Sequence, residues 1–237
     1  MSDGRRFLSV ENVPDHDIIE KRSQAAIVAI APVVLLAGFV LHPYIGLGPP
    51  DQTAVATAVA DHQTRWGAAH LVTGVGSGLL VLAFLAIRVQ LRENSPERWS
   101  ARGIPFIVMG SALYTFLPGM EFAPLAAAET GADVKGAAES LVAWFVPIHV
   151  IGALAFGAGV LAFRRGLADS GYLQGRTWQL VDCALVVMVV ARVVPLAGVQ
   201  FYVQGVAGVA ALWPLAAAMR AAAVHRSATN PLPVSSP

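Results

Sequence analysis

The sequence predicts an all-α integral membrane protein with six transmembrane helices. Of its 237 residues, 56% are hydrophobic and only 13% are charged, whereas soluble domains carry about 25% charged residues. Six apolar stretches are long enough to cross a bilayer, which takes about 20 residues of α-helix. Lys and Arg are concentrated in alternate connections between these stretches, a distribution that is typical of multi-pass membrane proteins.

The predicted spans follow one another along almost the whole chain. They cover about residues 25–45, 65–88, 103–125, 141–164, 177–199 and 201–222. We therefore expect a single transmembrane domain over residues 25–222. Residues 1–24 are polar and charged rather than a signal peptide, so they form a cytoplasmic segment, and residues 223–237 form a cytoplasmic tail.

The positions of the basic residues predict the orientation of the bundle. Thirteen Lys and Arg residues fall on the side that holds both termini, and two, Arg65 and Lys135, fall on the other side. Because basic loops stay in the cytoplasm, both termini are predicted to be cytoplasmic in the cell membrane. The net charge is only +1 and no basic patch is interleaved with aromatic residues, so we expect no nucleic-acid partner.

The connections and the small residues predict how the helices are joined and packed. Residues 53–61 and 132–140 are Ala-rich outer connections that we expect to form short helices, and the fifth connection is so short that the last two spans form a tight hairpin. Glycines are frequent in the second and fourth spans, where small residues let helix backbones approach closely. These two spans are therefore predicted to lie near the centre of the bundle.

A weak internal repeat relates the first two spans to the next two. Shifting the chain by 79 residues places residues 81–84 on the identical sequence at 160–163, and Gly78 on Gly157. The same shift places His42 on Glu121 and His70 on His149. Each unit starts inside, crosses the membrane and returns, so the sequence predicts two parallel helical-hairpin repeats followed by a third hairpin.

Five ionisable residues are predicted to gather in the outer half of the membrane. From the rise of about 1.5 Å per helical residue, His42, His70, Glu121, His149 and Arg192 all lie at similar depths. Gln200 and Gln204 border the same level. Ionisable groups inside a bilayer are costly and generally mark a functional site, so these residues are the candidate site.

Three chemistries are compatible with these side chains. In the first, a transition metal is held by three histidines and a carboxylate, namely His42, His70, Glu121 and His149. In the second, a haem b is held by His70 and His149, with Arg192 near a propionate. In the third, a pocket binds a small molecule, a lipid or an ion, and Glu121 pairs with Arg192 when the pocket is empty.

We prefer the third hypothesis, a ligand pocket open to the outer face in a transporter or a sensor. The other classes that stay open are a haem- or metal-binding membrane oxidoreductase, an accessory subunit of a larger membrane complex, and a purely structural role in which these residues fix helix register. Association with another membrane protein or with a second copy is also compatible with the small-residue faces. The sequence does not decide whether the protein is an enzyme.

Several classes are excluded by what the sequence lacks. Cys183 is the only cysteine, which rules out an intrachain disulfide and a cysteine-based metal cluster. The only lysines are Lys21 and Lys135, and neither lies in a predicted span. A retinal-binding rhodopsin needs such a lysine. P-loop and HExxH motifs are also absent.

Overall fold

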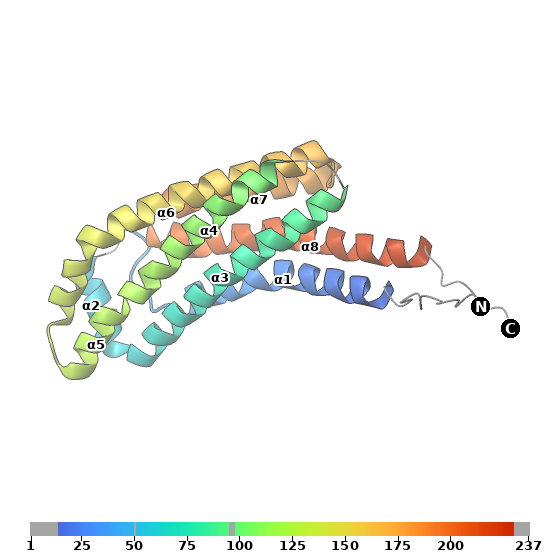
Figure 1. The fold of residues 1–237 in the computed structure, drawn as a ribbon. Coiled ribbons are helices and arrows are strands. Elements are labelled where there is room, and N and C mark those ends of the chain that lie inside the picture. The colour runs from blue at the N-terminus through green and yellow to red at the C-terminus, as the bar shows by residue number, and fades with distance from the viewer. Residues whose placement is uncertain (1–13, 50, 95–97, 230–237) are drawn as a thin grey trace, which may run out of the picture.

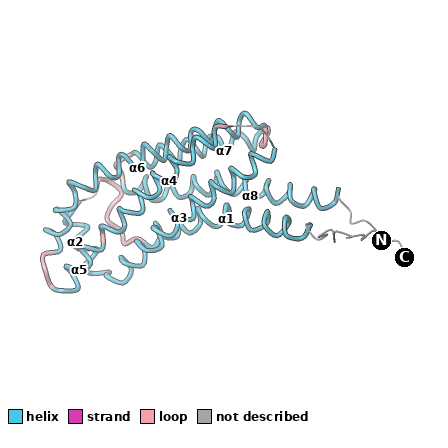
Figure 2. Tube along the Cα trace, in the orientation of Figure 1, coloured by secondary structure: helices cyan, strands magenta, loops and turns pink. Residues whose placement is uncertain are grey.

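The computed structural model describes residues 14–49, 51–94 and 98–229. These residues form a long bundle of α-helices with one π-helical turn (Figures 1 and 2), and the described part contains no strand. The all-α prediction is thus confirmed. The elements are α1 (Pro14–Leu41), α2 (Gln52–Asp61), α3 (Gln63–Asn94), α4 (Trp99–Met120), α5 (Phe122–Thr130), α6 (Val134–Ser170), α7 (Gly175–Val193), η1 (Val199–Val203) and α8 (Gln204–Thr229).

Five stretches are long and apolar enough to cross a membrane. They are Ile19–Leu41, Gln63–Glu93, Trp99–Thr130, Val134–Ser170 and Val199–Val224. Large apolar side chains on these helices face outward, among them Phe116 at 66% exposed, Trp144 at 68% and Leu154 at 62%. Such exposure is unfavourable in water and ordinary against lipid. The chain is therefore a multi-pass membrane protein.

The fifth predicted span, 177–199, differs from the helix that is observed. The helix α7 ends at Val193, before Pro195, and residues 199–203 belong to η1. Its 19 residues extend about 28 Å, slightly less than the hydrocarbon core of about 30 Å. It also carries two arginines and Asp182 within this length. Six spans are consequently not shown, and α7 as a sixth span stays a prediction.

Two long helices flank a short one in each half of the first 170 residues. The order α1–α2–α3 is followed by the same long–short–long order in α4–α5–α6. Figure 1 shows α2 and α5 together at one end of the bundle, opposite the end where α1 begins and α8 ends. This order is compatible with the predicted repeat, although the duplication itself stays a prediction.

The short helices agree only in part with the predicted outer connections. The predicted helix at 53–61 matches α2, which begins after Asp51, whose carboxylate accepts a hydrogen bond from the backbone N–H of Thr53. The predicted short helix at 132–140 is instead the first part of α6. Asp133 caps its start and accepts from the N–H of Gly136 at 2.9 Å. The second short helix, α5, lies earlier and ends at Gly131, whose φ is +70°.

Glycines allow the helices to pack closely, as predicted. A Cβ atom on Gly76 of α3 would lie 2.7 Å from the Cα of Leu35 in α1. On Gly159 of α6 it would lie 2.8 Å from the backbone nitrogen of Ile107 in α4. Real Cβ atoms do not approach this closely, so the α1–α3 and α4–α6 contacts both require glycine at these points.

Ion pairs join helices at the end of the bundle away from α2 and α5. Arg164 of α6 pairs with Asp182 of α7 through two hydrogen bonds. Lys21 of α1 lies 3.3 Å from the carboxylate of Glu93 in α3. The predicted site residues lie toward the opposite end, where α2 and α5 close the bundle.

Candidate functional site

His42, Trp66 and His70 form one compact group of rings. His42 immediately follows α1, whereas Trp66 and His70 are one turn apart on α3. The His42 and His70 ring centres are 5.0 Å apart, and the Trp66 ring lies 4.8 Å and 4.6 Å from them. Trp66 is 1% exposed and His70 is 7% exposed, so this group is a packed part of the structure.

Backbone carbonyls fix the hydrogen positions on both of these histidines. The Nδ1 atom of His42 is 2.7 Å from the carbonyl oxygen of Pro43, and that of His70 is 2.7 Å from the carbonyl oxygen of Trp66. A carbonyl oxygen only accepts, so each ring donates its Nδ1–H. The Nε2 atom of each neutral imidazole therefore keeps its lone pair. Both histidines present a hydrogen-bond acceptor or a metal ligand.

Glu121 occupies the junction between α4 and α5. Its backbone carbonyl accepts a hydrogen bond of 3.1 Å from the indole N–H of Trp66, which ties this junction to α3. Its side chain lines the same cavity as the two histidines. Among the described residues, no hydrogen bond or ion pair engages its carboxylate.

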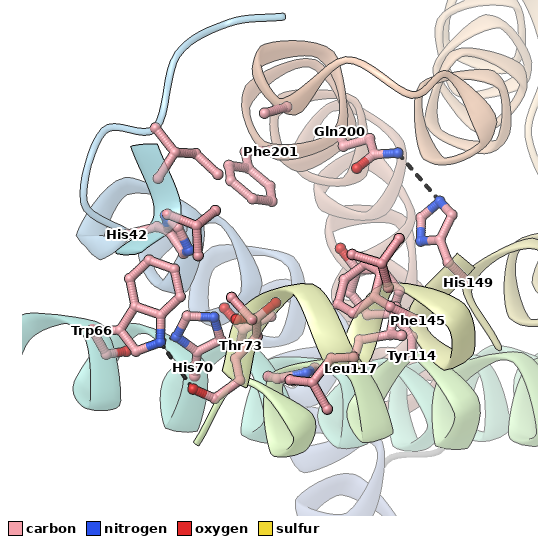
Figure 3. A pocket seen from close by; sticks show the side chains of 18 of the residues that line it. His42, Trp66, His70, Thr73, Tyr114, Leu117, Phe145, His149, Gln200 and Phe201 are labelled. Carbon is pink, nitrogen blue, oxygen red and sulfur yellow. Dashed lines mark hydrogen bonds between the residues drawn. The ribbon is translucent and has the colours of Figure 1, made fainter. Parts of the chain in front are cut away.

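His149 lies farther along the same cavity, on α6. Its Nε2 atom is 3.0 Å from the carbonyl oxygen of Arg192 and 3.2 Å from the side-chain nitrogen of Gln200. Since a carbonyl oxygen only accepts and an amide nitrogen only donates, Nε2 makes one or the other of these hydrogen bonds according to the tautomer of the ring. Figure 3 shows His149 and Gln200 on one side of the cavity, and His42, Trp66 and His70 on the other.

Arg192 does not form the predicted pair with Glu121. Its guanidinium is 1% exposed and lies between two rings, 3.8 Å from the centre of Tyr114 on α4 and 4.2 Å from the centre of Phe156 on α6. None of its side-chain nitrogens has a hydrogen-bond partner in the described part of the chain. The guanidinium is therefore in cation–π contact with two rings and not paired with a carboxylate.

A cavity of about 240 Å³ joins the predicted residues. His42, His70, Glu121 and His149 all line it, whereas Arg192 and Gln204 do not. Gln204 is 1% exposed, and its amide has no hydrogen-bond partner among the described residues. The other lining residues are Phe39, Ile45, Gln52, Val55, Trp66, Thr73, Tyr114, Leu117, Pro118, Ala138, Leu141, Val142, Phe145, Val146, Ala197, Gln200 and Phe201.

The cavity reaches the surface of the bundle along α6. Val142 and Val146 are one turn apart on this helix and both line the cavity. Their side chains are also 39% and 54% exposed. Two exposed apolar side chains of α6 thus form part of the cavity wall.

The four predicted metal ligands are not gathered around one point. In the described ranges, no group of three or more His, Cys, Asp or Glu side chains is placed to hold a metal ion. His42 and His70 are in contact, but His149 bonds to α7 and η1 instead. The four-ligand metal centre is thus not formed in this structure, and metal binding stays a prediction.

The size of the cavity argues against the haem hypothesis. Pockets for drug-sized ligands have volumes of about 300–1,000 Å³, and a haem is larger than most such ligands. A cavity of about 240 Å³ would hold it only if the helices moved apart. Arg192 is also enclosed by Tyr114 and Phe156, away from the place that a propionate would require.

Sequence reasoning missed most of the aromatic wall. The predicted site residues do not include the aromatic lining residues Phe39, Trp66, Tyr114, Phe145 and Phe201. One signal was available, because residues four apart on a helix share a face. That spacing relates Trp66 to His70 and Phe145 to His149.

Comparison of the chain with protein-family models, with curated proteins and with solved structures finds no match.

Proposed function

We propose that this multi-pass membrane protein binds a small organic molecule in the cavity between α1, α3, α4 and α6. The observation that carries the proposal is that four ionisable residues from separate parts of the chain line a single cavity of about 240 Å³. Ionisable side chains inside a bilayer are energetically costly, and they generally mark a functional site. Mostly apolar walls with a few polar groups are the usual composition of a ligand site.

The polar groups in this cavity are available to a ligand. His42 and His70 each keep one ring nitrogen without a hydrogen, and the Glu121 carboxylate has no partner among the described residues. A purely structural network would be expected to satisfy these groups internally. The unused hydrogen-bonding capacity of these groups favours the ligand-binding hypothesis over the structural one.

The test is ligand-induced stabilisation of the detergent-purified protein. The probes are 2-phenylethylamine, 2-phenylethanol and 3-phenylpropionate, each a single ring with a short polar chain. A probe present at about 100 times its dissociation constant adds about 2.7 kcal/mol to the free energy of unfolding. We expect at least one of them to raise the thermal midpoint.

A matched pair of variants localises the binding. Ala138 is 4% exposed and lines the cavity, so Ala138→Leu should fill part of it and remove the stabilisation. Ala126 is exposed on α5 and does not line the cavity, so Ala126→Leu should keep it. If no probe stabilises the wild-type protein, or if Ala138→Leu responds as strongly as the wild type, the proposal is wrong.

A second candidate is a transition metal bound by His42 and His70. The observation that favours it is that a backbone carbonyl holds each Nδ1–H, as is usual for metal-ligating histidines. Elemental analysis of protein purified without chelator tests this candidate. One equivalent of copper, zinc or iron that is lost in both His42→Ala and His70→Ala would support it.

We also propose that α7 is a sixth span and that both termini are cytoplasmic in the cell membrane. Support comes from the distribution of Lys and Arg and from the course of α7, which runs along α6 and α8 in Figure 1. In this orientation α2 and α5 lie on the outer side. The ligand cavity then opens in the outer half of the bilayer.

A further inference from the structure

The cavity contains one carboxyl side chain. Of its lining residues, all of which the structure describes, Glu121 is the only one that is Asp, Glu, Lys or Arg. An unpaired carboxylate is strongly unfavourable in such an apolar environment. A partner of opposite charge would remove much of this cost.

The three basic residues predicted for the outer half are each engaged elsewhere. Arg65 donates to the carbonyl oxygens of Leu41 and His42 at the end of α1, at 2.6 and 3.3 Å. Arg192 lies between two aromatic rings, and Lys135 is 3.6 Å from Glu139. None of these three cations lines the cavity. The protein thus keeps its own positive charges away from the Glu121 carboxylate.

Two histidines in the cavity add acceptors, whereas Gln52, Thr73, Tyr114 and Gln200 carry groups that can donate. His42 and His70 use their N–H groups on backbone carbonyls, so their free Nε2 atoms only accept hydrogen bonds. The side chains of both residues line the cavity with Glu121. A ligand that satisfies all three groups must donate several hydrogen bonds.

Aromatic rings form much of the remaining wall. Phe39, Trp66, Tyr114, Phe145 and Phe201 line the cavity, and Figure 3 shows the last four around it. The faces of such rings attract cations, and they do so more strongly when water is excluded. They also pack well against an apolar ligand body.

From these observations we infer that the ligand is a lipophilic amine that binds in its protonated, cationic form. The ammonium pairs with Glu121, and the apolar body packs against the aromatic rings. A cavity of about 150 Å³ accepts benzene, so one of about 240 Å³ has room for a single ring with a short chain. This inference rests on the proposed binding function and specifies its ligand class.

The experiment compares 2-phenylethylamine with 2-phenylethanol on the detergent-purified full chain at pH 7, by calorimetric titration. The two probes have the same size and both donate hydrogen bonds, and only the amine is positively charged. We expect the amine to bind about tenfold more tightly or better. The anion 3-phenylpropionate should bind more weakly than either.

Two carboxamide variants test the role of the carboxylate. In Glu121→Gln the affinities for the amine and the alcohol should become equal within about threefold, whereas Glu129→Gln should keep the wild-type ratio. Glu129 is an exposed carboxylate on the neighbouring helix α5 and does not line the cavity. It therefore controls for a change in surface charge.

The outcomes separate this inference from the proposed function. If 2-phenylethanol or the anion binds as tightly as the amine to the wild-type protein, the amine inference is wrong while small-molecule binding stands. This comparison needs no variant, so it holds even if Glu121→Gln fails to fold. An amine preference that survives in a folded Glu121→Gln also overturns the inference. If no probe binds, both the proposed function and the inference fail.

Discussion

The guanidinium carbon of Arg192 lies 3.8 Å from the centre of the Tyr114 ring, and the phenyl ring of Phe156 covers it at 4.2 Å. This cation is buried in the bundle without a hydrogen-bond acceptor in the described part of the chain. Burial of a charge without a carboxylate partner is costly, and replacing such a group by an apolar one of similar volume is often neutral or stabilising.

Arg192→Met is therefore expected to keep or raise the thermal midpoint of the purified protein. Arg192→Lys should lower it, because an ammonium lacks the planar surface that stacks between two rings. Differential scanning calorimetry in detergent measures both variants. A loss of stability in Arg192→Met larger than that in Arg192→Lys would show that the positive charge itself holds the helices together.

Arg192 and Glu121 are also predicted to be energetically independent. The structure shows no ion pair between them, since Arg192 contacts two rings and Glu121 faces the cavity. In a thermal-stability cycle, the effects of Arg192→Met and Glu121→Gln should add to within about 0.5 kcal/mol. A coupling energy well above that value, with partial rescue in the double variant, would mean that the two charges pair in the membrane.

A glycine pair on α3 tests the close contact between α1 and α3. The Cβ of Gly76→Ala would lie 2.7 Å from Leu35, whereas that of Gly78→Ala would meet no atom within 4 Å. We expect Gly76→Ala to cost about 1–3 kcal/mol, the usual range for overpacking, and Gly78→Ala to be neutral or slightly stabilising. Equal midpoints for the two variants would contradict the observed helix spacing.

The ring nitrogens of His42 and His70 give a spectroscopic prediction. Because both Nδ1 atoms face carbonyl oxygens at 2.7 Å, the Nε2 atoms should be unprotonated in the ligand-free protein. Nitrogen-15 NMR of protein labelled at histidine distinguishes the two tautomers. Addition of 2-phenylethylamine should shift both Nε2 signals, whereas the signal of His16, in the first turn of α1, should stay in place. Protonated Nε2 atoms would contradict the acceptor role.

The sequence predicts the apolar helices and the depth of the site more reliably than the pairing of side chains. Helix lengths follow from long apolar runs, and equal depths of His42, His70, Glu121 and His149 follow from counting residues along them. All four do line one cavity. Depth does not give the direction of a side chain around its helix axis, however, so the enclosure of Arg192 by Tyr114 and Phe156 was not predictable.

The predicted helix boundaries are wrong where a local signal competes with a run of apolar residues. The Ala-rich segment 132–140 has the composition of a short outer helix, but Asp133 caps a helix that continues through Pro147 to Ser170. The segment thus became the first part of α6. In α7 the opposite occurs, because Pro195 ends the regular helix before the apolar run is complete.

The sixth span is tested by the accessibility of cysteines introduced at the two ends of α7. Cys183 is exposed, so it is first replaced by Ala. Leu196 follows α7 and is 37% exposed, and Ser170, the last residue of α6, precedes α7.

If α7 crosses the membrane, a membrane-impermeant maleimide should label Leu196→Cys in intact cells and label Ser170→Cys only after permeabilisation. Thr57→Cys on α2 should behave like Leu196→Cys, because both lie at the end that the Lys and Arg distribution assigns to the outside. Labelling of Ser170→Cys and Leu196→Cys from the same side would leave only the five spans and place the C-terminal helix in the opposite orientation.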